Sequence, residues 1–173
     1  MRRKLVVGNW KMNGDRAFAR ELVAGVAAQL DEPACEVILC PPMTLLDTVR
    51  DGLAGCAIAL GAQTVSEHAS GAYTGEISVA MLADAGCTHV IVGHSERRAL
   101  YGETDAAVVD KFVAAQSGGL IPILCVGESL EERESGATES IVGRQVKAVL
   151  DGPGVGALAT AIVAYEPVWA IGT

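Results

Sequence analysis

Six short apolar runs, rich in β-branched residues, alternate with longer stretches of helical periodicity along the whole chain. The runs lie at residues 5–7, 37–40, 56–60, 89–92, 120–126 and 159–165. Their nearly continuous apolar character is typical of parallel strands that are buried on both faces. Between the first two runs, Phe18, Leu22, Val26 and Leu30 recur at helical spacing and predict a helix over 15–30. This alternation predicts βαβ units and therefore a parallel α/β fold.

Capping signals predict where three further helices begin. Thr104 is typical of an N-cap, and the helix that it opens is expected to stop at the glycine pair 118–119. Ser129 and Glu132 have the spacing of a capping box. A third apolar helical pattern begins after Thr138. These helices separate the last three apolar runs, as βαβ units require.

Two architectures agree with this order, an open doubly wound sheet and a (β/α)8 barrel. The segment Gly8-Asn9-Trp10-Lys11 follows the first run in place of a G-x-G-x-x-G pattern, which disfavours a dinucleotide-binding fold. No linker or shift in composition divides the chain, so residues 1–173 are expected to form a single domain. The connection over 64–77 is long, and loops of that length are usually functional.

Composition limits the partners and the location of the protein. The chain of 173 residues has a formal net charge of −8, which disfavours a nucleic-acid partner. It has no apolar run long enough to span a membrane, and the apolar stretch after its basic start is too short for a secretory signal. The five cysteines and three histidines lack the spacing of a metal or redox site. We expect free thiols, no metal and a cytoplasmic location.

Polar side chains follow three of the predicted strands where apolar residues end. Asn9 and Lys11 follow the first run, His94 the fourth and Glu166 the sixth. Each has a simpler explanation when taken alone: a solvated lysine, a loop histidine, a glutamate at a turn before proline. The carboxyl ends of parallel strands meet at one edge, however, so we expect all four side chains on one rim.

This set of groups suits proton transfer next to a carbonyl. A carboxylate that is aimed and shielded from water can remove a carbon-bound proton. The enediolate that results needs a hydrogen-bond donor on its oxygen and a cation nearby. A histidine at a helix N-terminus is favoured in its neutral form by the helix dipole, and it can then act as the donor.

Five segments carry a resemblance to the triosephosphate isomerase family. They are GNWKMN at 8–13, GAQ at 61–63, GAYTGE at 71–76, VGHSERR at 92–98 and AYEPVWAIGT at 164–173. They occur in the family's order and at its intervals, and the resemblance covers essentially the whole chain. It implies a parallel (β/α)8 TIM barrel and the interconversion of dihydroxyacetone phosphate and D-glyceraldehyde 3-phosphate through an enediolate. It also implies a place in glycolysis and gluconeogenesis, with no cofactor.

The resemblance implies a role for each matching site residue. Glu166 is similar to the catalytic base, and His94 to the electrophile that polarises the carbonyl. Lys11 is similar to a catalytic and substrate-binding lysine, and Asn9 to its substrate-binding partner. Glu96 resembles the carboxylate beside that lysine. The match of Cys125 to a position near the base implies only packing.

The resemblance further implies a lid and a homodimer. Gly172 is expected to contact the substrate phosphate as part of the lid. The lid residues are Pro167, Val168, Trp169, Ala170, Ile171, Gly172 and Thr173. The 64–77 loop is expected to form the interface of the dimer. The interface residues are Gln63, Thr74, Gly75, Glu76 and Arg97, with support from Glu103.

The length of the chain departs from the family pattern. A (β/α)8 barrel takes about 250 residues, so only about the first six β/α units are expected here and the domain is expected to be C-terminally incomplete. The phosphate-binding loops after strands seven and eight would then be absent. Two alternatives therefore stand beside the isomerase: a catalytically inert barrel fragment, and another phosphate-binding barrel enzyme.

Overall fold

The computed structural model describes residues 4–30 and 35–170. The strands are β1 (Leu5–Asn9), β2 (Glu36–Cys40), β3 (Ile58–Ala62), β4 (His89–Val92), β5 (Ile121–Val126) and β6 (Ile162–Tyr165). The α-helices are α1 (Arg16–Gln29), α2 (Leu46–Gly52), α3 (Val79–Asp84), α4 (Ser95–Tyr101), α5 (Asp105–Ser117), α6 (Leu130–Glu134) and α7 (Thr138–Asp151). Three short 3-10 helices are η1 (Met43–Leu45), η2 (Val155–Thr160) and η3 (Val168–Ala170). None of the helices in these two ranges is long and apolar enough to cross a bilayer.

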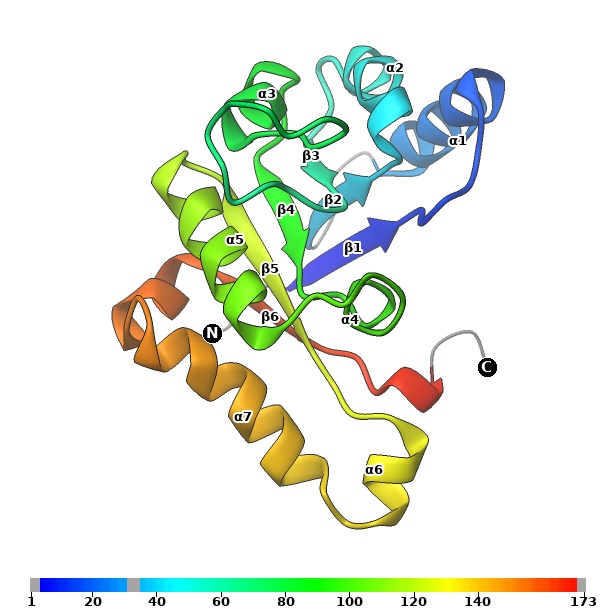
Figure 1. Ribbon diagram of the computed structural model, residues 1–173. Helices are drawn as coiled ribbons and strands as arrows, with labels where there is room; N and C mark the ends of the chain where they lie inside the picture. Colours follow the sequence, from blue (N-terminus) through cyan, green and yellow to red (C-terminus); the bar gives the residue numbers. More distant parts are fainter. Residues whose placement is uncertain (1–3, 31–34, 171–173) are drawn as a thin grey trace.

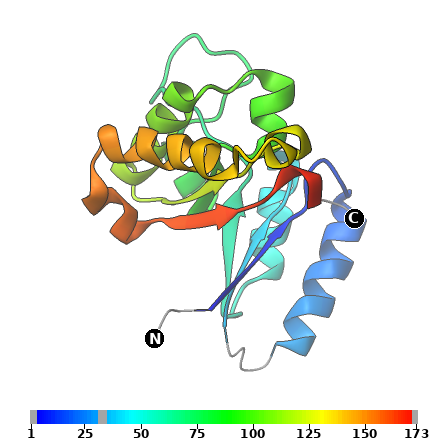
Figure 2. The same cartoon turned by 90° about the horizontal axis from the view of Figure 1, so that it is seen from below.

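The order of the strands decides between the two predicted architectures. All neighbouring pairs are parallel and the order is β1-β2-β3-β4-β5-β6, whereas a doubly wound sheet reverses its order at a switch point. The sheet curls, with α1, α2, α3, α5 and α7 around its outside (Figure 1). Seen from below, α1 (blue, lower right) and α7 (orange, across the upper half) again lie well apart (Figure 2). The described residues thus form six strands of a (β/α)8 barrel, and the predicted fold class is confirmed.

The two faces of the sheet bury different partners. On the outer face, alternate strand residues such as Val37 and Leu39 join a large cluster with helix residues such as Val23 and Phe112. The inner face carries a second, smaller cluster of strand residues alone. Its members are Ile38, Cys40, Ile91, Ile123 and Cys125, with Leu5, Val7, Ala59, Ile162 and Ala164 packed against them. All six strands contribute to this inner cluster, which is the pattern of a barrel interior.

The predicted helix starts agree with the structure. The Thr104 hydroxyl accepts a hydrogen bond from the N–H of Ala107, and α5 ends just before the predicted glycine pair. Ser129 and Glu132 make both hydrogen bonds of a capping box at the start of α6. The helix predicted after Thr138 is α7.

Two strand boundaries were wrong, and the buried face of one helix was predicted only in part, with Val26 and Leu30 packed against the core. The third strand begins at Ile58 because the N–H of Cys56 is used in a turn with the carbonyl of Leu53. The sixth begins at Ile162 because the preceding residues form η2. In α1 the fully buried positions are Ala19 and Val23, while Phe18 is 45% exposed. Helical spacing gives the period of a buried face, but neighbouring elements decide where that face is centred.

The long connection after β3 has no regular secondary structure up to α3, in agreement with the expectation for 64–77. Its ends are joined by a hydrogen bond from the N–H of Ser66 to the carbonyl of Ile77, at 2.8 Å. Across the loop, the rings of His68 and Tyr73 stack with centroids 3.9 Å apart. The connection therefore has a definite shape, although its tip around Thr74 is exposed.

Candidate active site

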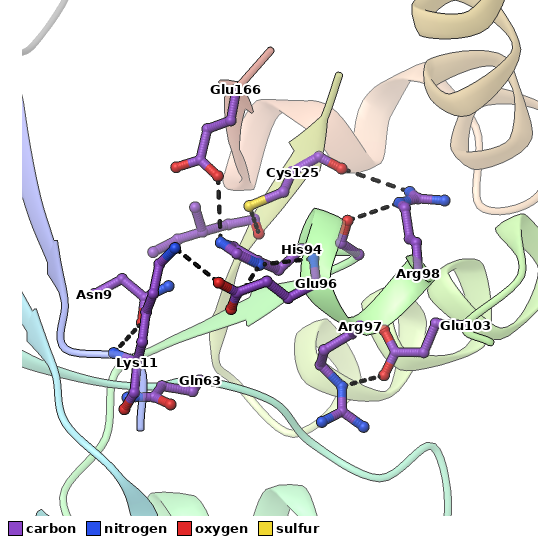
Figure 3. A network of polar contacts seen from close by, with 12 residues as sticks. Asn9, Lys11, Gln63, His94, Glu96, Arg97, Arg98, Glu103, Cys125 and Glu166 are labelled. Atoms are coloured by element: carbon purple, nitrogen blue, oxygen red, sulfur yellow. Dashed lines mark hydrogen bonds and ion pairs between the residues drawn. The ribbon is translucent and has the colours of Figure 1, made fainter. Parts of the chain in front are cut away.

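The carboxyl ends of the strands bring the predicted site residues to one rim (Figure 3). Asn9 ends β1 and Lys11 follows it, while His94 comes two residues after β4 and Glu166 directly after β6. Gln63 follows β3 and reaches the same rim. Parallel pairing places all of these strand ends at the same edge of the sheet. The structure thus brings together the amide, ammonium, imidazole and carboxylate groups.

The backbone of Lys11 is held in an unusual conformation. Its φ of 53° lies in the left-handed region, which a non-glycine residue rarely adopts. Three hydrogen bonds support it: Asn9 Oδ1 accepts from the N–H of Lys11 at 3.0 Å, and Gln63 Nε2 donates to the carbonyls of Lys11 and Cys40 at 2.8 and 2.9 Å. Gln63 thus supports Lys11 within its own chain, and its place at a dimer interface stays a prediction.

The ammonium group of Lys11 is paired with Glu96. Lys11 Nζ lies 2.8 Å from Glu96 Oε1, and both side chains are partly exposed. The hydrogen bond from Lys11 is the main cause that holds the pKa of Glu96 below its usual value. The pair fixes the position of the ammonium group at the rim, as expected for a carboxylate beside the lysine.

His94 is buried, and α4 fixes its ring. It is the N-cap of α4, and its Nδ1 accepts a hydrogen bond from the N–H of Glu96 at 3.2 Å. An acceptor nitrogen carries a lone pair, so the neutral ring has its proton on Nε2. That Nε2 lies 3.5 Å from Glu166 Oε2. The histidine thus presents an N–H donor toward the carboxylate, the orientation that an electrophile requires.

Glu166 faces His94 with a buried oxygen that can still accept hydrogen bonds. Its Oε2 accepts no hydrogen bond from the described residues, although its side chain as a whole is 42% exposed. Cys125 lies nearby, and burial followed by the charge of Glu166 raises the pKa of this thiol to about 12. The thiol therefore stays protonated near neutral pH, which agrees with a packing role. A shielded carboxylate oxygen with free acceptor capacity is what a general base needs.

Glu128 belongs to this region and was not singled out from the sequence. It is fully buried after β5, and its carboxylate accepts hydrogen bonds from Tyr165 Oη and Trp169 Nε1, each at 3.1 Å. Burial disfavours its charged form, but these hydrogen bonds and Arg133 outweigh that effect and lower the pKa of Glu128. The strand-end rule that selected the other residues also selects Glu128, because it follows Val126 by two positions.

The predicted lid begins against Glu128. The N–H of Val168 donates to the Glu128 carbonyl at 3.0 Å, and residues 168–170 form η3. Trp169 also stacks under the guanidinium group of Arg133, at 4.3 Å from the ring centroid. Pro167 and Ala170 close this turn through a backbone hydrogen bond. The remaining predicted lid residues, Ile171, Gly172 and Thr173, lie outside the described residues.

The predicted interface residues lie on the 64–77 loop and on two other segments of the chain. Thr74, Gly75 and Glu76 are at the exposed loop tip. Arg97 is on α4, where its guanidinium group pairs with Glu103. Lys111 pairs with the same carboxylate oxygen at 2.6 Å. Burial disfavours the charged form of Glu103, but the hydrogen bonds from Lys111 and Arg97 outweigh it and lower the pKa of Glu103.

The comparisons with known proteins agree with this geometry. A family model described as triosephosphate isomerase matches residues 4–173. The chain belongs to the triosephosphate isomerase family. It is 57% identical over 173 residues to the triosephosphate isomerase of Dechloromonas aromatica, and 58% identical to that of Thiobacillus denitrificans. These alignments cover 100% of this chain and 70% and 69% of the relatives.

Solved structures place the chain in the same family. The crystal structure of triosephosphate isomerase from Bartonella henselae matches with a TM-score of 0.88 and 44% sequence identity. The match covers 96% of this chain and 69% of that one. The predictions of an isomerase and of a TIM barrel are therefore confirmed. In the ranges 4–30 and 35–170, no three His, Cys, Asp or Glu side chains are grouped so that they could hold a metal ion.

Proposed function

We propose that this chain interconverts dihydroxyacetone phosphate and D-glyceraldehyde 3-phosphate through an enediolate, with Glu166 as the base and His94 as the electrophile. The observation that carries the proposal is the approach of Glu166 Oε2 to His94 Nε2 at 3.5 Å. The carboxylate oxygen is shielded, accepts no hydrogen bond from the described residues and faces an N–H donor. Membership of the triosephosphate isomerase family supports the same reaction.

The reaction divides into two proton transfers. Glu166 removes a proton from C1 of dihydroxyacetone phosphate, and the electron pair of the C–H bond forms the C1–C2 double bond of the enediolate. The carbonyl oxygen on C2 takes up the negative charge and accepts a hydrogen bond from Nε2 of His94. The hydroxyl proton on C1 then passes to the oxygen on C2 by way of Nε2 of His94, and Glu166 delivers its proton to C2. The base thus regains its ionised form and the aldehyde is complete.

Lys11 and Asn9 are proposed to bind the substrate beside these two groups. The ammonium group of Lys11 offsets negative charge on the phosphate and on the enediolate oxygen. Its pairing with Glu96 at 2.8 Å holds it at the rim before substrate arrives. Preorganisation of this kind matters because a cation already in place needs no rearrangement when charge develops. Gly172 is proposed to contact the phosphate from the lid.

Glu166→Gln tests the base. The amide is nearly isosteric with the carboxylate but does not take up a proton, so kcat with dihydroxyacetone phosphate should fall by roughly 10²- to 10⁴-fold. Circular dichroism should show an unchanged fold. Activity close to that of the parent would contradict the assignment. If the parent protein itself shows no turnover, the inert fragment is the better description, and turnover of a different carbonyl substrate would favour another barrel enzyme.

We also propose a homodimer in the cytoplasm, formed through the 64–77 loop. The loop is supported by the His68–Tyr73 stack and the Ser66–Ile77 hydrogen bond, while Thr74 is exposed at its tip. A protruding loop with a definite shape can insert into a second copy at little entropic cost. Thr74→Arg should shift sedimentation toward the monomer, whereas Ser140→Arg on the exposed side of α7 should not. A dimer that withstands the Thr74 change would contradict this interface.

A further inference from the structure

Residues 126–128 form a platform on which the segment carrying Glu166 lies. The N–H of Glu166 donates to the carbonyl of Val126 at 2.9 Å, and the N–H of Val168 donates to the carbonyl of Glu128 at 3.0 Å. Gly127 lies between these two contacts. The position of the base therefore depends on where these three residues are held.

Gly127 contacts the backbone of Glu166 directly. A Cβ atom added at Gly127 would lie 2.0 Å from the carbonyl oxygen of Glu166 and 2.8 Å from its carbonyl carbon. Backbone atoms cannot swing aside as the end of a long side chain can. Any movement of Gly127 toward or away from β6 is thus transmitted to the base.

Gln145, on α7, holds Gly127 from the other side. Its Oε1 accepts from the N–H of Gly127 at 2.9 Å, and its Nε2 donates to the carbonyl of Gly127 at 3.1 Å. The two bonds also settle the orientation of the amide, because the flipped side chain would set donor against donor and acceptor against acceptor. Only 6% of Gln145 is exposed. Both polar atoms of the Gln145 amide are therefore hydrogen-bonded to the backbone of Gly127.

Packing alone does not hold the platform on this side. A cavity of about 520 Å³ adjoins it, and Gly127, Gln145, Glu166 and Val168 are among the residues that line the cavity. Atoms that face open space lose dispersion contacts on that side. The two directional hydrogen bonds from Gln145 therefore fix the position of residues 126–128, which the surrounding side chains do not constrain on the side of the cavity.

We propose that Gln145 is a positioning residue for the catalytic base. It holds Gly127 and, through it, keeps Glu166 in line with His94. The proposal rests on the proposed function for its catalytic part. Its structural part, that Gln145 keeps residues 126–128 and the segment on them in place, can be tested without turnover.

The structural test uses the two tryptophans of the chain as probes. Trp169 Nε1 donates to Glu128, one residue from Gly127, whereas Trp10 lies near α1 against Phe18. In Gln145→Met, which keeps the length of the side chain but not its hydrogen bonds, the indole N–H signal of Trp169 in an NMR spectrum should shift and exchange faster with solvent. The Trp10 signal should not change.

Gln116→Met is the matched control. Gln116, near the end of α5, also holds a remote segment through its amide, because its Nε2 donates to the carbonyl of Ala157 at 2.7 Å and to Thr160 Oγ1 at 2.9 Å. This change should leave the Trp169 signal where it is. An unaltered Trp169 signal in Gln145→Met, or an equal shift in Gln116→Met, would overturn the proposal. If Gln145→Met does not fold, Gln145→Glu decides in the same way, since it keeps the acceptor for the Gly127 N–H and loses only the donor.

The catalytic test compares the same variants on dihydroxyacetone phosphate. A displaced base should lower kcat by roughly 10- to 100-fold in Gln145→Met, with KM within about twofold of the parent. Substrate deuterated at C1 should then show a larger isotope effect on kcat, because proton removal becomes the slow step. Gln116→Met should keep the parental kcat even where its melting temperature falls as far. A shifted Trp169 signal with unchanged kcat would overturn the positioning role, whereas a parent without turnover would refute the proposed function and leave the indole test in force.

Discussion

The two halves of the candidate site are held in place by different means. His94 is 7% exposed at the side chain, and the helix that follows it in the sequence fixes its ring through one hydrogen bond to Glu96. Glu166 is 42% exposed, and remote segments hold it: Val126 at the end of β5, Gly127 just after it and, through Gly127, Gln145 from α7. His94 is therefore positioned by its neighbours in the sequence, whereas Glu166 is positioned by tertiary contacts.

This difference teaches where each half can fail. The position of His94 should withstand changes elsewhere in the fold, because the residues that fix it are adjacent in sequence. The position of Glu166 depends on every element that contributes a contact to it. A shift of about 1 Å at the reacting group can lower the rate by 10²-fold. We therefore expect mutations distant from the site to affect the base more than the donor.

The largest effect should come from separating the two roles of His94, donor and N-cap. His94→Ala removes both, whereas His94→Asn keeps a capping side chain that is too short to reach Glu166. Both variants should lose roughly 10²- to 10³-fold in kcat with dihydroxyacetone phosphate. Only His94→Ala should also lose about 0.5–2 kcal/mol of unfolding free energy in urea titrations. Equal stability of the two variants would show that the ring does not cap α4.

The next effect tests the tertiary half at Gly127. Gly127→Ala places a Cβ against the backbone of Glu166, so the base must move and kcat should fall by about 10²-fold. Gly143→Ala on α7 is the control, since a Cβ there meets nothing within 4 Å. It should keep the parental kcat and gain roughly 0.5–1 kcal/mol of stability, as alanine replaces glycine inside a helix. Full activity in Gly127→Ala would mean that Gly127 does not position the base.

The smallest effect concerns acid stability and Glu128. Its pKa is lowered in the folded protein, so the unfolded chain binds more protons at acid pH. The stabilisation is fully present above the usual carboxyl pKa of about 4.3 and is lost as the pH falls through the lower folded value. Urea titrations between pH 7 and pH 3 should therefore show a shallower acid decline for Glu128→Gln than for the parent. An identical decline would show that Glu128 is not part of the acid response.

Much of the fold follows from local sequence patterns. The alternation of apolar runs and helical periods indicated six parallel strands, and the side chains of Thr104 and Ser129 marked two helix starts correctly. Helix caps are predictable because donor and acceptor lie within four residues of each other. The buried face of α1 was predicted only in part: Val26 and Leu30 pack against the core, but Ala19 was not singled out, since it is selected by what packs against it and not by its own hydrophobicity.

The same limit applies to the site. The strand-end rule placed Asn9, Lys11, His94 and Glu166 on one rim, because it needs only the strand order. Neither periodicity nor capping singles out Gln145, a polar residue within an amphipathic helix. Its hydrogen bonds to Gly127 join residues 18 apart in the sequence and exist only once α7 packs beside β5. Pairings of this kind come from the assembled fold and leave no local signature.

The sequential order of the strands has a consequence for how the protein is made. Each strand pairs only with the strands before and after it in the chain, so the sheet can grow unit by unit as the polypeptide leaves the ribosome. Lys11 and His94 then reach their places early, and β6 brings Glu166 onto a platform that already exists. A nascent chain released before that point would carry Lys11 and His94 but not Glu166. Completion of the sixth strand is thus the step of synthesis at which Asn9, Lys11, His94 and Glu166 are first present together at the rim.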